Sequence, residues 1–134
     1  MNGLGDSHTP PPPSHLLGVA ASSNKNKWQM VIVVVDDGGN LVYLQRLDET
    51  QIGSIKIAIE KARSAITFKR PTKAFEDALV GGPMAILGIT GAFPSEGGHP
   101  LVMHGKFIGA IGVSGGTAQE DGQAARAGAA ALTK

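Results

Sequence analysis

Four histidines offer the most versatile chemistry in this sequence, because imidazole transfers protons and coordinates metals near neutral pH. They are His8, His15, His99 and His104. No two stand four residues apart, as two ligands on one helix face would, and His99 and His104 would point to opposite faces of a regular strand. A shared metal site is therefore not predicted. A single histidine can still ligate haem iron, and His99 is the best candidate because Gly97 and Gly98 before it let a flat ligand approach; His15 is the weaker one.

A glycine-rich stretch, residues 109–116, offers a second kind of site. It precedes a predicted helix, whose first N–H groups and dipole can bind an anion, with Ser114 and Thr117 beside them. The stretch matches neither the dinucleotide fingerprint nor the P-loop. Tight packing of a strand that turns sharply into a helix explains the same glycines. Ser114 satisfies a bare Gly-x-Ser-x-Gly pattern, but no histidine follows it, which argues against a serine hydrolase.

Acidic residues gather at two places where they have ordinary structural roles. Asp36 and Asp37 end a predicted strand at a turn, where aspartates bond the turn backbone. Glu120 and Asp121 fall in the first turn of the last predicted helix, where their negative charges interact favourably with the helix dipole. Glu120 also completes a capping box with Thr117. A catalytic carboxylate pair and a surface metal site are the functional alternatives for these residues.

Composition limits the class of protein. A length of 134 residues fits one domain, and 12 Lys+Arg against 11 Asp+Glu give no electrostatic argument for nucleic acid. There is no cysteine, hence no disulfide or thiolate chemistry. The longest clean apolar run has six residues, against about 20 for a membrane helix, and no signal peptide is visible. We expect a cytoplasmic protein that contacts no membrane; a secreted or periplasmic mature form would have the same sequence.

Periodicity predicts an α+β fold. β-branched residues 28–36, the turn Asp37-Gly38-Gly39-Asn40 and residues 41–47 predict a hairpin whose first strand is buried on both faces. Residues 51–68 repeat apolar side chains every three or four positions, as a helix does, with Lys61 off the apolar stripe. The remaining elements are a short helix at 71–79, an irregular segment at 81–98, strands at 99–104 and 107–114 around a Gly105-Lys106 turn, and an Ala-rich helix at 117–132. The predicted domain, residues 15–134, is therefore an antiparallel sheet of two hairpins flanked by helices, after a Pro-rich leader at 1–14 and an ambiguous short helix at 15–27.

Four blocks resemble one known family when taken in order. They are Val33-Val-Val-Asp-Asp-Gly-Gly-Asn-Leu-Val42, Lys61-Ala-Arg-Ser-Ala-Ile-Thr-Phe68 with Pro71-Thr72, Gly97-Gly-His-Pro100, and Ile108-Gly-Ala-Ile-Gly-Val-Ser-Gly-Gly116 with Asp121 and the Ala-rich helix. Together they resemble the GlcG/HbpS-like haem-binding family, related to the C-terminal domain of PduO-type proteins. The resemblance implies an α+β domain, assembly into homo-oligomers, and haem binding with haem degradation or redox sensing in some members.

The chain differs from that family in two respects. A Pro-rich leader replaces the usual long first helix, and His99 stands where members usually have an apolar residue. His99 as an iron ligand is thus an inference from its chemistry and is not carried over from the family.

The leading hypothesis is a haem-binding oligomeric accessory protein with His99 on the iron. Arg70 and Lys73 would meet the propionates, and Met84, Ile86, Leu87, Phe93 and Met103 would supply apolar contacts. The alternatives are a module or enzyme that binds a small organic acid or pathway intermediate, with Ser114 and Thr117 at its anion site, and a structural subunit without a ligand. A core with only six aromatic residues makes self-association an ordinary way to gain stability.

Overall fold

The structure is a computed structural model that describes residues 28–82 and 84–133. The expectations for the leader and for the short helix at 15–27, with His8 and His15, lie outside these residues. The described elements are β1 (Val31–Asp36), β2 (Leu41–Arg46), α2 (Gly53–Phe68), α3 (Lys73–Gly81), a 3-10 helix η1 (Met84–Gly88), β3 (Gly98–Met103), β4 (Lys106–Ser114) and α4 (Ala118–Leu132). The predicted α+β class is confirmed.

The four strands form one antiparallel sheet in the order β2-β1-β4-β3. Both predicted hairpins are present, and they join through β1 and β4, where Val33 lies opposite Gly112. The first turn is held as predicted, because the Asp36 carboxylate accepts the backbone N–H groups of Gly38 and Asn40, each at 2.9 Å. These hydrogen bonds lower the pKa of Asp36, and the bond from the Asn40 N–H has the largest effect.

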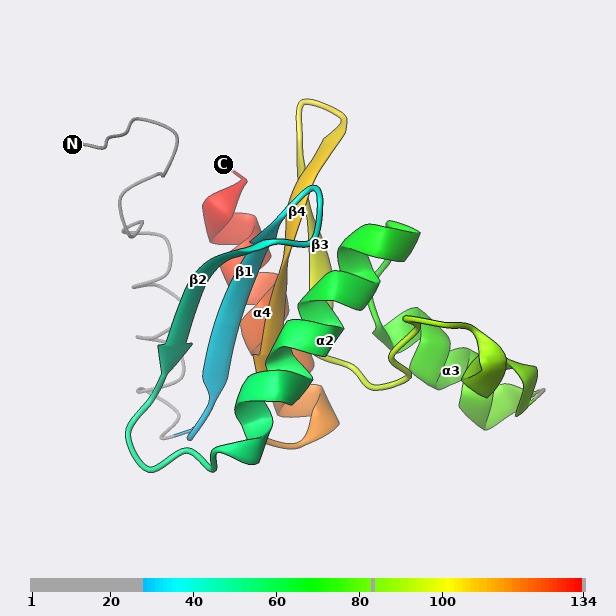
Figure 1. The fold of residues 1–134 in the computed structure, drawn as a ribbon, viewed down its shortest axis with the longest axis horizontal. Coiled ribbons are helices and arrows are strands. Elements are labelled where there is room, and N and C mark those ends of the chain that lie inside the picture. The colour runs from blue at the N-terminus through cyan, green and yellow to red at the C-terminus, as the bar shows by residue number, and fades with distance from the viewer. Residues whose placement is uncertain (1–27, 83, 134) are drawn as a thin grey trace.

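Helices cover both faces of the sheet, α2 on one and α4 on the other (Figure 1). The odd residues Val31, Val33 and Val35 pack with the alanines of α2, and the even residue Ile32 packs with the alanines of α4. All four side chains are at most 1 % exposed, which confirms the prediction of a strand buried on both faces. Burying each one contributes about 1.5–3 kcal/mol relative to exposure.

Small residues let the layers approach closely. A Cβ at Gly112 would overlap the carbonyl oxygen of Ala58 and stand 2.7 Å from the backbone nitrogen of Ala62, so α2 lies directly on β4.

Helix α4 begins with the predicted capping box, in which Thr117 Oγ1 accepts the Glu120 N–H and the Glu120 carboxylate accepts the Thr117 N–H. The third helix, α3, projects beyond the sheet with η1 (Figure 1).

Two local predictions were wrong. The second hairpin turns at His104-Gly105, one residue earlier than expected, and His104 adopts a left-handed φ of 52°. His104 is therefore an exposed turn residue, so the opposite-face argument for the two histidines does not apply. The helical period predicts Lys61 off the apolar stripe, but the residue is only 2 % exposed.

Candidate functional site

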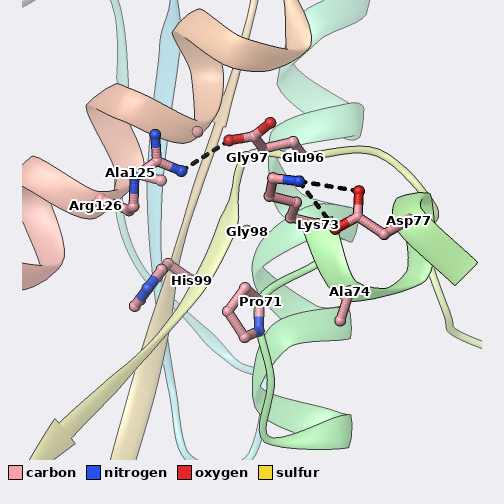
Figure 2. A pocket seen from close by; sticks show the side chains of 11 residues that line it. Pro71, Lys73, Ala74, Asp77, Glu96, Gly97, Gly98, His99, Ala125 and Arg126 are labelled. Carbon is pink, nitrogen blue, oxygen red and sulfur yellow. Dashed lines mark hydrogen bonds and ion pairs between the residues drawn. The ribbon is translucent and has the colours of Figure 1, made fainter.

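A surface pocket of about 290 Å³ lies where α3, the start of β3 and α4 meet (Figure 2). Residues 96–99 form its centre, α3 supplies one wall and α4 the other. Its lining comprises Pro71, Lys73, Ala74, Asp77, Glu96, Gly97, Gly98, His99, Gly122, Ala125 and Arg126. Of the residues predicted from the sequence, the structure therefore brings His99 and Lys73 to one site.

His99 is half-buried, and the carbonyl of its neighbour Pro100 selects the tautomer of its ring. Nδ1 lies 3.0 Å from the carbonyl oxygen of Pro100. Because a carbonyl oxygen only accepts, Nδ1 must carry the hydrogen, and in the neutral ring Nε2 then holds the lone pair. No interaction within residues 28–82 and 84–133 uses Nε2. A neutral imidazole oriented by a backbone carbonyl is the arrangement that metal-binding histidines commonly show.

The backbone before His99 is held by the beginning of α3. The Gly98 N–H donates to Thr72 Oγ1 at 2.8 Å, and the Thr72 N–H donates to the Gly98 carbonyl at 3.0 Å. Thr72 is fully buried. This reciprocal pair of hydrogen bonds fixes the floor of the pocket against α3.

The charged groups of the pocket are ion-paired. Lys73 Nζ lies 2.9 Å from both carboxylate oxygens of Asp77, and this hydrogen bond raises the pKa of Lys73. Arg126 Nη1 lies 2.8 Å from Glu96 Oε2. Two cations and two anions leave the lining with no net charge, so the pocket does not select a strongly charged ligand by its field alone.

A buried ion pair lies behind this floor. Lys61 Nζ is 2.9 Å from Asp121 Oδ2 and 3.0 Å from the Val113 carbonyl oxygen. A Cβ added at Gly97 would stand 2.8 Å from Lys61 Nζ, so the ammonium group lies directly beneath the pocket floor. Burial raises the pKa of Asp121, and the charge of Lys61 opposes that shift.

Sequence reasoning missed this pair. The spacing did contain the signal, because Lys61 lies three residues after Ala58 and four before Ala65, on the face that contacts the sheet. Asp121 is predicted from the sequence to serve the helix dipole, yet its carboxylate is 4 % exposed and points inward.

The other predicted ligand-binding residues do not line this pocket. Arg70 lies after α2 with its guanidinium 5.7 Å from the Phe75 ring centroid. Phe93 and Met103 are half-buried elsewhere, Ser114 is buried at the end of β4, and Thr117 caps α4. The apolar candidates Met84, Ile86 and Leu87 belong to η1, in which no residue is buried.

The predicted anion site at the start of α4 already holds the chain's own carboxylates. The Gly116 N–H donates to Asp121 Oδ1 at 2.9 Å, and the Thr117 N–H donates to Glu120 Oε1 at 3.0 Å. An external anion would have to displace them.

Further site types are limited within the described part of the chain. Residues 28–82 and 84–133 contain no group of three or more metal-ligating His, Asp or Glu side chains, and none of their helices is long and apolar enough to cross a membrane. A second surface hollow, of about 400 Å³, lies between Lys69, Lys106 and Phe107 and has no histidine in its lining.

Several known proteins are similar to this chain in sequence and in fold. Protein GlcG of Escherichia coli K12 is 42% identical over 77 residues, which are 58% of each chain. The chain spans about three-fifths of the length of the curated relatives it matches, at 62% and 58%.

Solved structures match over nearly the whole chain. The Klebsiella pneumoniae protein ORFY has a TM-score of 0.84 at 28% identity, covering 98% of this chain and 96% of its own. A double mutant of HbpS from Streptomyces reticuli has a TM-score of 0.81 at 28% identity, covering 100% and 94%. A PduOC–haem complex has a TM-score of 0.78, covering 87% and 88%; at 23% identity it supports the fold alone.

The family model described as "Haem degrading protein HbpS-like" matches residues 16–130. That range takes in the whole sheet, the helices on both its faces and the pocket around His99. The resemblance seen in the four sequence blocks is thereby confirmed, and the chain belongs to the HbpS-like family.

Proposed function

We propose that this protein binds haem in the pocket beside His99, with His99 Nε2 as the protein ligand of the iron. The observation that carries the proposal is the hydrogen bond from Nδ1 to the Pro100 carbonyl, which in the neutral ring places the lone pair on Nε2, beside the pocket that His99 lines. Haem iron needs only one such protein ligand. The description of the matching family model as haem-degrading supports the choice of haem over a bare metal ion.

The residues of the pocket fit a flat ligand that carries an iron atom. The backbone of Gly97 and Gly98 forms the floor, where a Cβ at either position would point to the interior and meet Lys61 instead of entering the pocket. Ala74 and Ala125 offer small apolar contacts on the two walls. Bound haem would supply redox chemistry; the chain would hold it through His99 and would fix the tautomer of that imidazole through the Pro100 carbonyl.

A visible-absorbance titration with hemin tests the proposal. We expect saturable binding with a Soret shift, and more than about tenfold weaker binding by His99→Ala, because the iron–nitrogen bond is lost. His104→Ala is the matched control, since His104 is exposed in a turn and does not line the pocket.

Each outcome of the titration has a defined meaning. Equal affinity of the two variants and the wild-type protein would remove His99 as the ligand. No saturable shift in the wild-type protein would refute haem binding and favour the small organic acid alternative.

Haem degradation and redox sensing are finer forms of the same proposal. Loss of the Soret band in air with a mild reductant, accompanied by a bile-pigment absorbance, would identify degradation. Reversible change of the band with oxidant and reductant, without pigment, would identify sensing.

Self-association is also part of the proposal. Val80, Met84 and Leu87, on α3 and η1, expose 84%, 68% and 57% of their surface, which is typical of an apolar patch covered by a partner. Light scattering at two protein concentrations measures whether a homo-oligomer forms.

A further inference from the structure

We infer that Arg126 binds the acidic groups of the ligand in this pocket and that the buried carboxylate of Glu96 holds its guanidinium in position. The inference rests on the proposed function, because for haem those acidic groups are the propionate carboxylates. Neither residue was among the candidates that the sequence suggested.

Glu96 is a fixed anchor. Its side chain is 6 % exposed, its Oε2 accepts from Arg126 Nη1 at 2.8 Å, and its backbone N–H donates to Glu76 Oε1 at 2.9 Å. A Cβ at Gly122 would overlap the Glu96 carboxylate, so the absence of a side chain on this turn of α4 makes room for it. A buried carboxylate held in this way fixes the direction of the arginine that pairs with it.

Arg126 keeps most of its hydrogen-bonding capacity. A guanidinium has five N–H donors in one plane. Among the described residues its only hydrogen bond is the one to Glu96, and the side chain is 53 % exposed. Figure 2 shows Arg126 on α4 and His99 on β3 on the same side of the pocket, with Lys73 and Asp77 on the other. The remaining N–H groups are suited to a carboxylate, which a planar guanidinium binds with two parallel hydrogen bonds.

The competing cations are less well placed. Lys73 Nζ already lies 2.9 Å from both oxygens of Asp77. Arg70 does not line the pocket, and its Nε donates to the Phe68 carbonyl at 3.0 Å. Arg126 therefore takes over the role that the sequence suggested for Arg70.

Hemin and its dimethyl ester distinguish carboxylate recognition from haem binding as such. Both contain the same iron porphyrin, but the ester has no ionised propionates. We expect Arg126→Gln to weaken hemin binding about tenfold, the effect of one exposed charge-assisted contact, and to leave binding of the ester within about twofold of wild type.

Two further variants complete the test. Arg70→Gln should match the wild-type protein for both ligands. Arg126→Lys keeps the charge without the planar fork and should lose part of the preference for hemin. Circular dichroism confirms that each variant is folded.

The outcomes separate this inference from the proposed function. If Arg126→Gln keeps the wild-type ratio of hemin to ester affinity, Arg126 is not the carboxylate-binding group, although haem binding stands. A wild-type protein that binds hemin and ester equally well overturns carboxylate recognition altogether. A wild-type protein that binds neither removes the proposed function, and the inference about Arg126 falls with it.

Discussion

The buried ion pair behind the pocket gives the sharpest prediction about stability. Lys61→Met keeps a long side chain in the same space but leaves the Asp121 carboxylate, 4 % exposed, without its cation. The Val113 carbonyl also loses its donor at 3.0 Å. Removing one partner of a buried pair costs about 3–5 kcal/mol, against a total unfolding free energy of about 5–15 kcal/mol for a domain.

The loss should depend on pH, with a sign that follows from Asp121. Burial raises the pKa of this carboxyl above 3.8, and Lys61 is the largest opposing influence. Without Lys61 the folded pKa rises further. As the pH rises, Asp121 loses its proton in the unfolded chain before it does in the folded one. The free energy of unfolding therefore falls as the pH rises from about 3.8, the unfolded pKa, through the pKa of Asp121 in the folded state, and it is regained on acidification.

Urea unfolding at several pH values from about 4 to 7 measures this effect. The free energy of unfolding falls by about 1.5 kcal/mol per molar urea for a domain of this kind. A destabilisation of about 3 kcal/mol therefore lowers the urea midpoint of unfolding at pH 7 by about 2 M. Lys61→Met with Asp121→Asn removes both charges and should recover part of the loss at pH 7. Lys73→Met is the control, because Lys73 has the same 2.9 Å contact to a carboxylate but lies in solvent; its midpoint should not change.

Two results would refute this reasoning. A Lys61→Met midpoint within about 0.5 M of wild type at pH 7 would mean that the pair contributes little net stability. An equal loss at every pH from about 4 to 7 would mean that packing, and not the uncompensated carboxylate, accounts for the cost.

The other predictions concern the elements that support the site. Thr117→Ala removes the cap of α4 and should cost about 1 kcal/mol in thermal or urea unfolding; no loss would mean that solvent replaces the cap fully. Gly112→Val should prevent stable folding, because its side chain would overlap the backbone of Ala58 and Ala62, and a variant with normal unfolding and circular dichroism would contradict this close contact. His99→Ala, described above, tests a ligand contact and should leave the unfolding midpoint nearly unchanged. Arg126→Gln leaves the Glu96 carboxylate, 6 % exposed, without its cation and should lower the midpoint.

Much of the fold could be predicted because local rules and tertiary packing agree in it. The valines of β1, the Asp-Gly turn and the capping box of α4 each specify their own geometry. The hairpin at His104 was misplaced by one residue because Gly105 suits either position of a two-residue turn, and the sequence alone does not say that His104 takes a left-handed φ.

The site could be predicted only in part. The two glycines before His99 single it out as a candidate ligand, and it does line the pocket, where its role as a ligand stays a prediction. Glu96 and Arg126 lie 30 residues apart and meet because Gly122 opens space between α4 and the loop before β3, a relation that no local pattern reveals. Lys61 was misassigned although its spacing from Ala58 and Ala65 places it on the face that contacts the sheet, because its partner Asp121 lies 60 positions away and a lone lysine is otherwise expected at the surface.

The projection of α3 from the body of the protein has a consequence for how a broad ligand could enter. Phe75 is the only residue of α3 that is buried, and η1 has none. Beyond the hydrogen bonds of Thr72 and Glu76 at the start of α3, few contacts therefore oppose local opening of the rest of this segment. His99 and Arg126 instead lie on elements that pack against the core clusters. Native-state hydrogen exchange should therefore show one wall of the pocket opening at much lower free energy than the other. The pocket can then widen on the α3 side for a large planar molecule, while His99 and Arg126, which would bind that molecule, keep their positions on the opposite side.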